Sequence, residues 1–255
     1  MAPSPPERPP GADLLPVERT AEALARDLVV DEDADLVRWT DKCGVRRVTG
    51  FHDYAALYAV PGLYEAAYFV ALRGRAPDLL ADLLADAVPD PSVARVLDVG
   101  CGTGAVGTAL RRRGFGPVAG IDLEPAVLTA VPRDRPGTYG TLRALDLTAL
   151  PPDDRAWLAA VAPDVVTVVA AVGFGHLPLA AFRVLADLLP PGGLLALTVA
   201  RDLADTPALA DHAALLLGPA FRHRAARDGV HRTTASGRDL LVTALVLERT
   251  SHTSG

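Results

Sequence analysis

One stretch, residues 95–104 with the sequence RVLDVGCGTG, constrains the fold more than any other part of the chain. Its first half is short, branched and apolar, which is typical of a buried strand in a parallel sheet. Its second half has glycine at alternate positions, and glycine permits left-handed backbone angles and a close approach by a ligand. Residues 105–113 follow with helical spacing and end at Gly114. The stretch predicts a strand, a tight turn and a helix, an arrangement that binds nucleotide-like ligands at the edge of parallel sheets.

Composition indicates one principal domain with a small appendage. The chain has 255 residues, half of them hydrophobic, which is enough for a full core. The formal net charge of −6 argues against a nucleic-acid partner, because no broad basic field is implied. Cys43 and Cys101 lie far apart in the sequence and offer no disulfide framework or zinc-site spacing. No apolar run reaches the ~18 residues of a membrane span. We expect a cytoplasmic monomer or homodimer with no metal and no membrane partner.

The N-terminal third differs from the rest of the chain. Residues 1–12 are rich in proline and predict a disordered tail, not a signal peptide. Residues 13–91 predict a helical cap, whose segment 51–69 is aromatic in a chain with only 5% aromatic residues. Two interpretations of this segment stay open: a cap with its own small core, or a lid that lines a substrate pocket. The substrate-binding candidates here are Tyr54, Tyr58 and Tyr64.

Residues 92–250 predict an α/β domain, because apolar strands alternate with amphipathic helices. Strands are expected at 95–99, 117–121, 139–144, 164–170 and 194–199, followed by two antiparallel strands at 220–234 and 238–248. This alternation places helices on both faces of a parallel sheet, as in a doubly wound fold.

Three acidic residues, Asp98, Asp122 and Asp146, stand at the ends of three successive predicted strands. These ends share one edge of a doubly wound sheet, so the three carboxylates are expected along one groove. Asp122 lies 18 residues after Gly104, a spacing that suits hydrogen bonds from ribose hydroxyls. The turn lacks the Lys-Ser/Thr of a phosphate loop, and an acid before it is unfavourable for phosphate. The pattern favours a nucleoside ligand that carries an amino group.

With these features, residues 96–104 closely resemble motif I of the class I S-adenosylmethionine-dependent methyltransferases. The resemblance continues through GIDL at 120–123, LDL at 145–147 and LPPGGLL at 189–195. It implies a Rossmann-like, doubly wound seven-stranded sheet of order 3-2-1-4-5-7-6 with strand 7 antiparallel. It also implies S-adenosylmethionine as cofactor in the domain formed by residues 92–250.

The resemblance assigns a role to each motif. The glycines would pack under the methionine part of the cofactor, and Asp98 would bear on its amino end through the turn or a water. Asp122 would hold the ribose and Asp146 the adenine amine. The implied cofactor-binding residues are Asp98, Gly100, Cys101, Gly102, Gly104, Asp122, Leu123, Asp146, Leu147, Ala170 and Ala171.

The residues at the end of the fourth predicted strand do not identify the methyl acceptor. It lacks the Asn/Asp-Pro-Pro-Tyr/Phe signature for amino groups of bases or glutamine, and it has no acid for a catechol-type metal site. His176 and His52 are the candidate catalytic bases, since neutral imidazole suits a base near pH 7, although either could be merely exposed. Phe174 is a further substrate-binding candidate. His231 and Arg232 lie either at a substrate carboxylate or at the surface.

The expected function is methyl transfer from S-adenosylmethionine to an oxygen or nitrogen of a small-molecule acceptor, such as a specialised metabolite. Two alternatives stay open. One is a non-methylating enzyme on the same fold, such as a cyclase. The other is a cofactor-binding partner or regulatory subunit of a separate catalytic chain.

Overall fold

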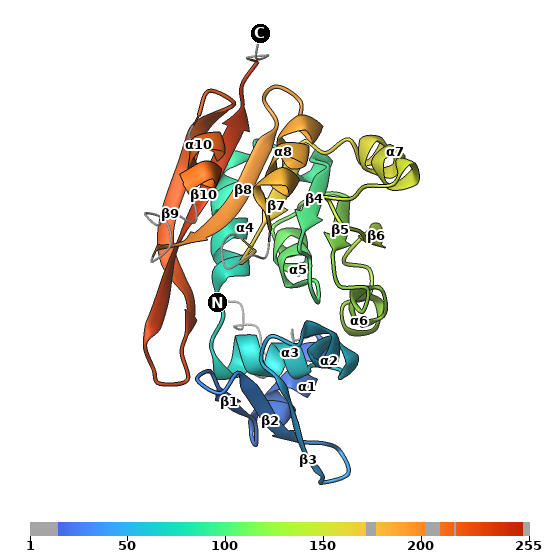
Figure 1. Ribbon diagram of the computed structural model, residues 1–255, viewed down its shortest axis with the longest axis vertical. Helices are drawn as coiled ribbons and strands as arrows, with labels where there is room; N and C mark the ends of the chain where they lie inside the picture. Colours follow the sequence, from blue (N-terminus) through green and yellow to red (C-terminus); the bar gives the residue numbers. More distant parts are fainter. Residues whose placement is uncertain (1–14, 172–176, 202–209, 217, 252–255) are drawn as a thin grey trace, which may run out of the picture.

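The computed structural model consists of a seven-stranded sheet flanked by helices and a smaller N-terminal cap (Figure 1). It describes residues 15–171, 177–201, 210–216 and 218–251. The cap contains α1 (Pro16–Ala25), β1 (Val29–Asp31), β2 (Leu36–Thr40), β3 (Arg46–Gly50), α2 (Tyr54–Ala59), α3 (Leu63–Glu65) and the π-helix η1 (Ala66–Ala71). The rest contains α4 (Ala76–Ala87), η2 (Pro91–Val93), β4 (Val96–Val99), α5 (Ala105–Arg112), β5 (Val118–Asp122), α6 (Val127–Asp134), β6 (Thr141–Ala144), α7 (Pro152–Val161), β7 (Val165–Val168), α8 (Leu179–Leu188), β8 (Leu194–Ala200), α10 (Ala210–Leu216), β9 (Phe221–Thr233) and β10 (Asp239–Arg249).

The order of the large sheet is β6-β5-β4-β7-β8-β10-β9, which confirms the predicted doubly wound topology. The first five strands in this order pair in parallel, and β10 is antiparallel to both β8 and β9. Val99 at the end of β4 pairs with Ile121 on one side and Val168 on the other. The carboxyl ends of the central strands therefore share one edge of the sheet, as the sequence predicts.

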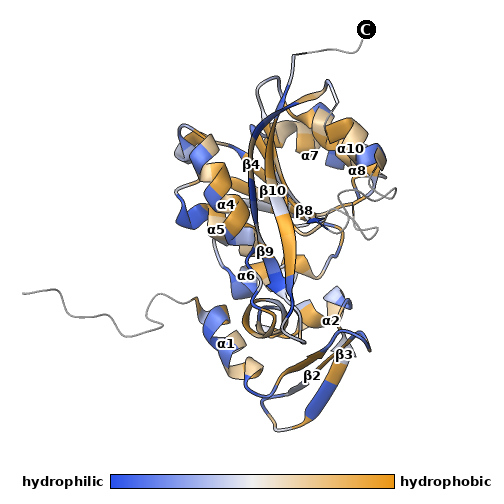
Figure 2. Cartoon of the chain, turned by 90° about the vertical axis from the view of Figure 1, so that its left-hand side faces the viewer, coloured by the Kyte–Doolittle hydropathy of each residue, from blue (hydrophilic) through white to orange (hydrophobic). Residues whose placement is uncertain are grey.

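Successive side chains of β4 point to opposite faces of the sheet and so belong to two different hydrophobic cores. Leu97 and Val99 pack with α7, α8 and α10, whereas Val96 packs with α4 and α5. Figure 2 shows the sheet from its side, with α4 and α5 on one face and α7, α8 and α10 on the other. All four residues of β4 are buried, because helices cover both faces of a parallel sheet.

Helix α4 packs against the large sheet, although the sequence analysis assigned its residues to the cap. Leu80 and Leu84 of α4 are fully buried in the same core as Val96 and Val246. The helical prediction for this segment holds, but its partner is the sheet. The position of a domain boundary near residue 92 stays a prediction.

The cap contains a three-stranded antiparallel sheet, β1-β2-β3, that the sequence did not indicate. Val37 and Trp39 of β2 point inward, and their strand is joined to β3 by a turn around Gly44, whose φ is +77°. The Asp41 carboxylate accepts hydrogen bonds from the Cys43 and Val45 amides and so fixes this turn. The strands are too short for their alternation to stand out in the sequence.

The cap packs against the sheet domain through α6 and the β9–β10 hairpin. Val127 and Val131 of α6 are buried in the same cluster as Leu57 and Leu63 of the cap. In Figure 1 the hairpin extends down to the cap, and there the Thr233 amide donates to the Leu72 carbonyl at 2.7 Å. The cap is therefore held on two sides.

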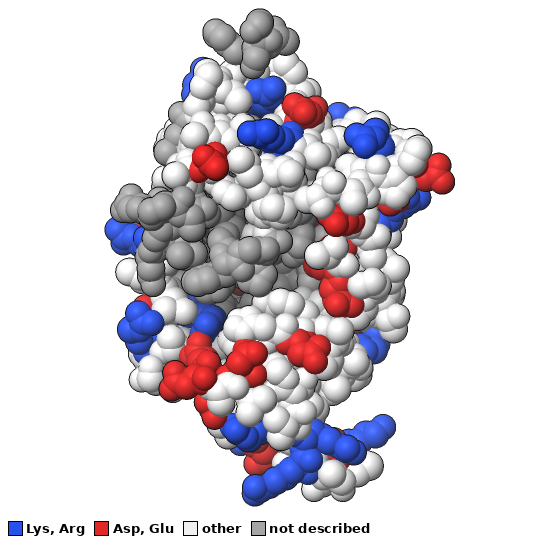
Figure 3. Space-filling model, viewed as in Figure 1, with Lys and Arg blue, Asp and Glu red and all other residues white. Residues whose placement is uncertain are grey.

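The opposite end of the cap is basic. Figure 3 shows Lys and Arg side chains gathered over the β2–β3 hairpin, where Lys42, Arg46 and Arg47 are exposed. Charged side chains on an edge strand such as β3 oppose pairing with another chain. Among the helices that the structure describes, none has both the length and the apolar character to cross a bilayer.

Candidate functional site

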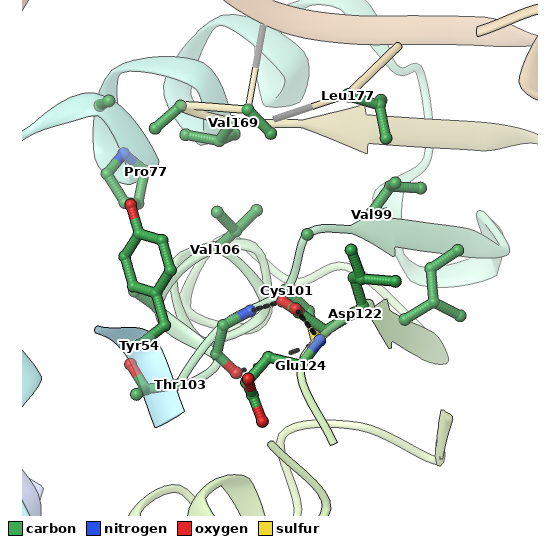
Figure 4. Close-up of a pocket in the computed structure, with 18 of the residues that line it drawn as sticks. Tyr54, Pro77, Val99, Cys101, Thr103, Val106, Asp122, Glu124, Val169 and Leu177 are labelled. Atoms are coloured by element: carbon green, nitrogen blue, oxygen red, sulfur yellow. Dashed lines mark hydrogen bonds between the residues drawn. The ribbon is translucent and has the colours of Figure 1, made fainter. Parts of the chain in front are cut away.

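A cavity of about 550 Å³ lies between the cap and the carboxyl ends of the central strands. The turn after β4, the ends of β5, β6 and β7, the start of α4, the aromatic segment of the cap and the end of β9 all contribute to its walls. In Figure 4, Asp122 and Glu124 lie beside Cys101 of the turn, while Tyr54 and Pro77 stand across the cavity. The predicted groove is thus a real cavity with a roof from the cap.

The glycine turn has left-handed backbone angles, and a side chain at Gly102 would be tightly placed against the cap. Gly100, Gly102 and Gly104 have φ values of +67°, +50° and +90°. A Cβ on Gly102 would lie 3.0 Å from the Tyr58 hydroxyl, and one on Gly100 would lie 3.4 Å from the Ala171 Cβ. The turn needs glycine both for its backbone and for the close approach of the cap.

Asp122 connects the end of β5 to this turn. Its Oδ2 accepts the Gly102 amide hydrogen at 2.8 Å, and its Oδ1 accepts that of Glu124 at 2.9 Å. Burial raises the pKa of the Asp122 carboxyl, while the two amides oppose the increase. A carboxylate has about four acceptor positions, so this side chain retains capacity for hydroxyl groups of a ligand.

Asp98, in contrast, faces the protein interior and does not line the cavity. It is 0% exposed and accepts hydrogen bonds from the Tyr139 hydroxyl at 2.6 Å and the Thr167 hydroxyl at 2.7 Å. Burial raises the pKa of Asp98 to about 7, although these two hydroxyls favour the charged form. Asp98 therefore supports the strand from within, and any contribution to ligand binding through the turn stays a prediction.

The end of β6 brings the third acid to the cavity. Asp146 is exposed, and its Oδ1 accepts hydrogen bonds from the Thr148 amide at 2.8 Å and the Thr148 hydroxyl at 2.7 Å. These bonds lower the pKa of Asp146. Further predicted residues also line the cavity: Leu123 after β5, Leu147 after β6, and Ala170 and Ala171 after β7.

The aromatic segment of the cap forms one wall of the cavity. Tyr54, Tyr58 and Tyr64 line it as expected, and the next helical turn adds Tyr68 and Phe69. The ring centroids of Tyr64 and Tyr68 are 4.5 Å apart in a stacked arrangement. Burial raises the pKa of Tyr58 and Tyr64, so both hydroxyls stay protonated near pH 7. The same aromatic signal in the sequence pointed to the two additional residues.

The candidate histidines are separated by the fold. The side chain of His52 is 57% exposed, contacts Asp35 at 2.5 Å and lies outside the cavity lining. His176 and Phe174 lie outside the residues that the structure describes. His231 and Arg232, which the sequence left between two interpretations, both line the cavity. Within the described ranges, no group of three His, Cys, Asp or Glu side chains has the arrangement of a metal site.

Comparisons with known proteins agree with this geometry. The family model of a methyltransferase domain matches residues 72–240. Human methyltransferase-like protein 27 is 37% identical over an alignment of 158 positions, and the match covers 56% of this chain and 61% of that protein. The chain thus matches less than two thirds of the length of this relative.

Solved structures show the same fold at low sequence identity. The cyclase SpnF is 19% identical with a TM-score of 0.52, over 69% of this chain and 82% of that chain. A S-adenosylmethionine-dependent methyltransferase from Methanosarcina mazei is 16% identical with a TM-score of 0.50, over 66% of this chain and 97% of that chain. With its motif I turn and its sheet order, the chain belongs to the class I S-adenosylmethionine-dependent methyltransferases.

Proposed function

We propose that this chain binds S-adenosylmethionine and transfers its methyl group to an oxygen or nitrogen of a small-molecule acceptor, such as a specialised metabolite. The main observation is that the glycine turn, the Asp122 carboxylate and the tyrosine wall meet in one cavity. The family supplies the reaction class, and the cavity supplies a site with room beyond the cofactor motifs.

The residues present fit the nucleoside part of this cofactor. Asp122 offers acceptors for ribose hydroxyls, and Leu123 and Leu147 supply apolar surface for a base. Asp146 offers an acceptor for an exocyclic amine. Three carboxylates at the ends of β5 and β6, Asp122, Glu124 and Asp146, oppose a phosphate and suit a ligand with positive charge.

When bound, S-adenosylmethionine supplies a methyl group attached to a positively charged sulfur. The chain has to align the acceptor with that group and keep water away. The glycine turn permits close approach, and Tyr58 lies over Gly102. The stacked rings of Tyr64 and Tyr68 give the acceptor a rigid apolar wall. The cap therefore acts in both alignment and exclusion of water.

Calorimetry first tests binding of the cofactor, and an assay of methyl transfer then tests the reaction. We expect S-adenosylhomocysteine to bind, and Asp122→Ala to weaken binding by about 1–3 kcal/mol, as for a lost hydrogen bond to a charged group. The control is Asp153→Ala, which removes an exposed carboxylate outside the cavity. Undiminished affinity in Asp122→Ala would remove this residue from its role.

Methyl-labelled cofactor with a panel of small acceptors should then yield labelled product and S-adenosylhomocysteine. Binding of the cofactor without turnover across a broad panel would favour the two alternatives, a non-methylating enzyme or a partner subunit. No binding at all would refute the proposal.

A further inference from the structure

We infer that His231 and Arg232, at the end of β9, form the subsite that binds a carboxylate of the methyl acceptor, with His231 as a neutral hydrogen-bond donor. The inference rests on the proposed function, because it names the acceptor class of the same cavity. It assigns to His231 the role of a specificity-determining residue and not that of a base.

The position of these residues separates them from the cofactor motifs. In the sheet order, β9 is the edge strand and stands four places from β4. The His231 carbonyl accepts the Arg75 amide hydrogen at 2.8 Å, which fixes this part of β9 against the start of α4. His231 and Arg232 therefore line the cavity from the side opposite to β5 and β6.

The two nitrogens of the His231 ring have different surroundings. Nδ1 is buried and has no hydrogen-bond partner in the described part of the chain, whereas Nε2 is not among the buried unpartnered atoms. Among main-chain groups, a buried N–H without an acceptor is rarer than an under-satisfied carbonyl, and we apply the same preference to the two ring nitrogens. The favoured tautomer therefore leaves Nδ1 unprotonated and carries the hydrogen on Nε2.

Electrostatics keep this imidazole neutral. Burial, together with the neighbouring Arg232 charge, lowers the pKa of His231 to about 4. A ring with so low a pKa is a weak base near pH 7, but its Nε2–H donates a hydrogen bond as well as any imidazole. The chemistry of His231 thus fits recognition of an oxygen atom better than removal of a proton.

Arg232 adds positive charge at the same place and is firmly oriented. Its Nη1 is 2.5 Å from the Glu32 carboxylate, and its side chain is only 13% exposed. Its guanidinium carbon lies 5.5 Å from the centre of the Phe51 ring. A guanidinium has five N–H donors, so the pair with Glu32 leaves capacity for a ligand.

The charges in the cavity are therefore unevenly distributed. Asp122, Glu124 and Asp146 lie where β5 and β6 end, whereas Arg75 and Arg232 lie where α4 begins and β9 ends. At the second place Glu32 offsets part of the charge of Arg232, and the positive charge of Arg75 remains, so a carboxylate would be attracted and an ammonium group repelled. Since the adjoining wall consists of stacked tyrosine rings, the class of acceptor that fits is an aromatic carboxylate.

A matched series of phenols tests the inference on the protein saturated with S-adenosylhomocysteine. 4-Hydroxybenzoate, 4-hydroxybenzyl alcohol and tyramine share one ring and differ in the charge of the substituent. Dissociation constants from NMR titration should place 4-hydroxybenzoate at least tenfold tighter than the alcohol, with tyramine weakest. Equal affinities, or a preference for tyramine, would overturn the inference.

Two variants then identify the donor. His231→Phe should weaken 4-hydroxybenzoate about tenfold and leave the alcohol within about threefold, the scale of one hydrogen bond to a charged group. His231→Gln retains an N–H donor and should keep most of the preference. His223→Phe removes an exposed imidazole from the same strand and is the matched control.

Affinity for S-adenosylhomocysteine, measured on the same proteins, separates the possible failures. Unchanged affinity in His231→Phe is expected. If that variant loses S-adenosylhomocysteine and not 4-hydroxybenzoate, the carboxylate recognised is that of the cofactor, and the inference is wrong. If the unmodified protein does not bind S-adenosylhomocysteine, the proposed function itself fails.

Discussion

The buried Asp98 gives this protein a pH-dependent stability that a single substitution should remove. Asp98 is 0% exposed, and burial raises its pKa from 3.8 to about 7. Between these two pH values the folded chain retains a proton that the unfolded chain has released. The stability contributed by this proton is fully present below pH 3.8 and is lost as the pH rises through 7.

The size of the effect follows from the pKa difference of about three pH units. Each pH unit in this window corresponds to about 1.4 kcal/mol, so the whole window corresponds to at most about 4 kcal/mol. Asp98→Asn keeps the shape of the side chain and cannot ionise. Its amide must still meet the Tyr139 and Thr167 hydroxyls, but that cost does not vary with pH.

Urea denaturation at several pH values between 5 and 8 measures the difference directly. The free energy of unfolding of Asp98→Asn, minus that of the unmodified protein, should rise with pH and level off above pH 7. Asp153→Asn, at an exposed position, should show a constant difference. A constant difference for Asp98→Asn as well would refute the argument, because the carboxyl would then titrate alike in both states.

Three further substitutions test the cavity and its supports. Asp122→Asn should weaken S-adenosylhomocysteine about 10- to 100-fold in calorimetry, since the amide cannot accept as many hydrogen bonds, and an unchanged constant would contradict this. Glu65 is 2% exposed, and its carboxylate lies 3.5 Å from the Arg135 guanidinium. Arg135→Leu should lower the free energy of unfolding by about 3–5 kcal/mol, because it leaves this buried carboxylate without its partner. Adding Glu65→Gln should recover part of that loss, and no recovery would refute the pairing. Gly102→Ala should abolish the rise in melting temperature that S-adenosylhomocysteine causes. If contact between the new Cβ and the Tyr58 hydroxyl is the reason, adding Tyr58→Phe should restore part of that rise.

The part of the cavity at the glycine turn and the ends of β5 and β6 was predictable because its signals are local. The glycine turn follows β4, and Asp122 ends the neighbouring parallel strand β5. Two adjacent βα units therefore suffice to place Asp122 beside Gly102. The orientation of Asp98 could also have been derived from the sequence. Side chains alternate along a strand, so Asp98 shares a face with Val96, and both faces of this sheet are covered.

The part of the cavity formed by the cap and the end of β9 depends on contacts between distant segments. Which side chains of β9 face the cavity depends on two register irregularities against β10, between Leu240 and Leu241 and between Val246 and Leu247. No periodic pattern in the sequence reveals such shifts. His52 was misplaced for a local reason: Asp53 caps α2 by accepting the Ala56 amide, so His52 precedes the helix and faces solvent.

The aromatic segment both packs in a core of the cap and lines the cavity, because its helices have two faces, whereas its role as a lid over a substrate stays a prediction. Leu57 and Leu63 are fully buried in the core that the cap shares with α6, while Tyr54 and Tyr64 line the cavity. Glu32 in the turn after β1 reaches the β9–β10 hairpin, where its Oε2 accepts the Ala235 amide hydrogen at 2.7 Å.

The tyrosine wall and the arginine end of the cavity are thus built by the cap and the hairpin together, away from the ends of β5 and β6. Exchange of the cap alone would separate Glu32 from Arg232 and disturb the positive end of the cavity. We therefore expect the Glu32–Arg232 contact to survive an exchange only when the cap and the end of β9 are exchanged as one unit.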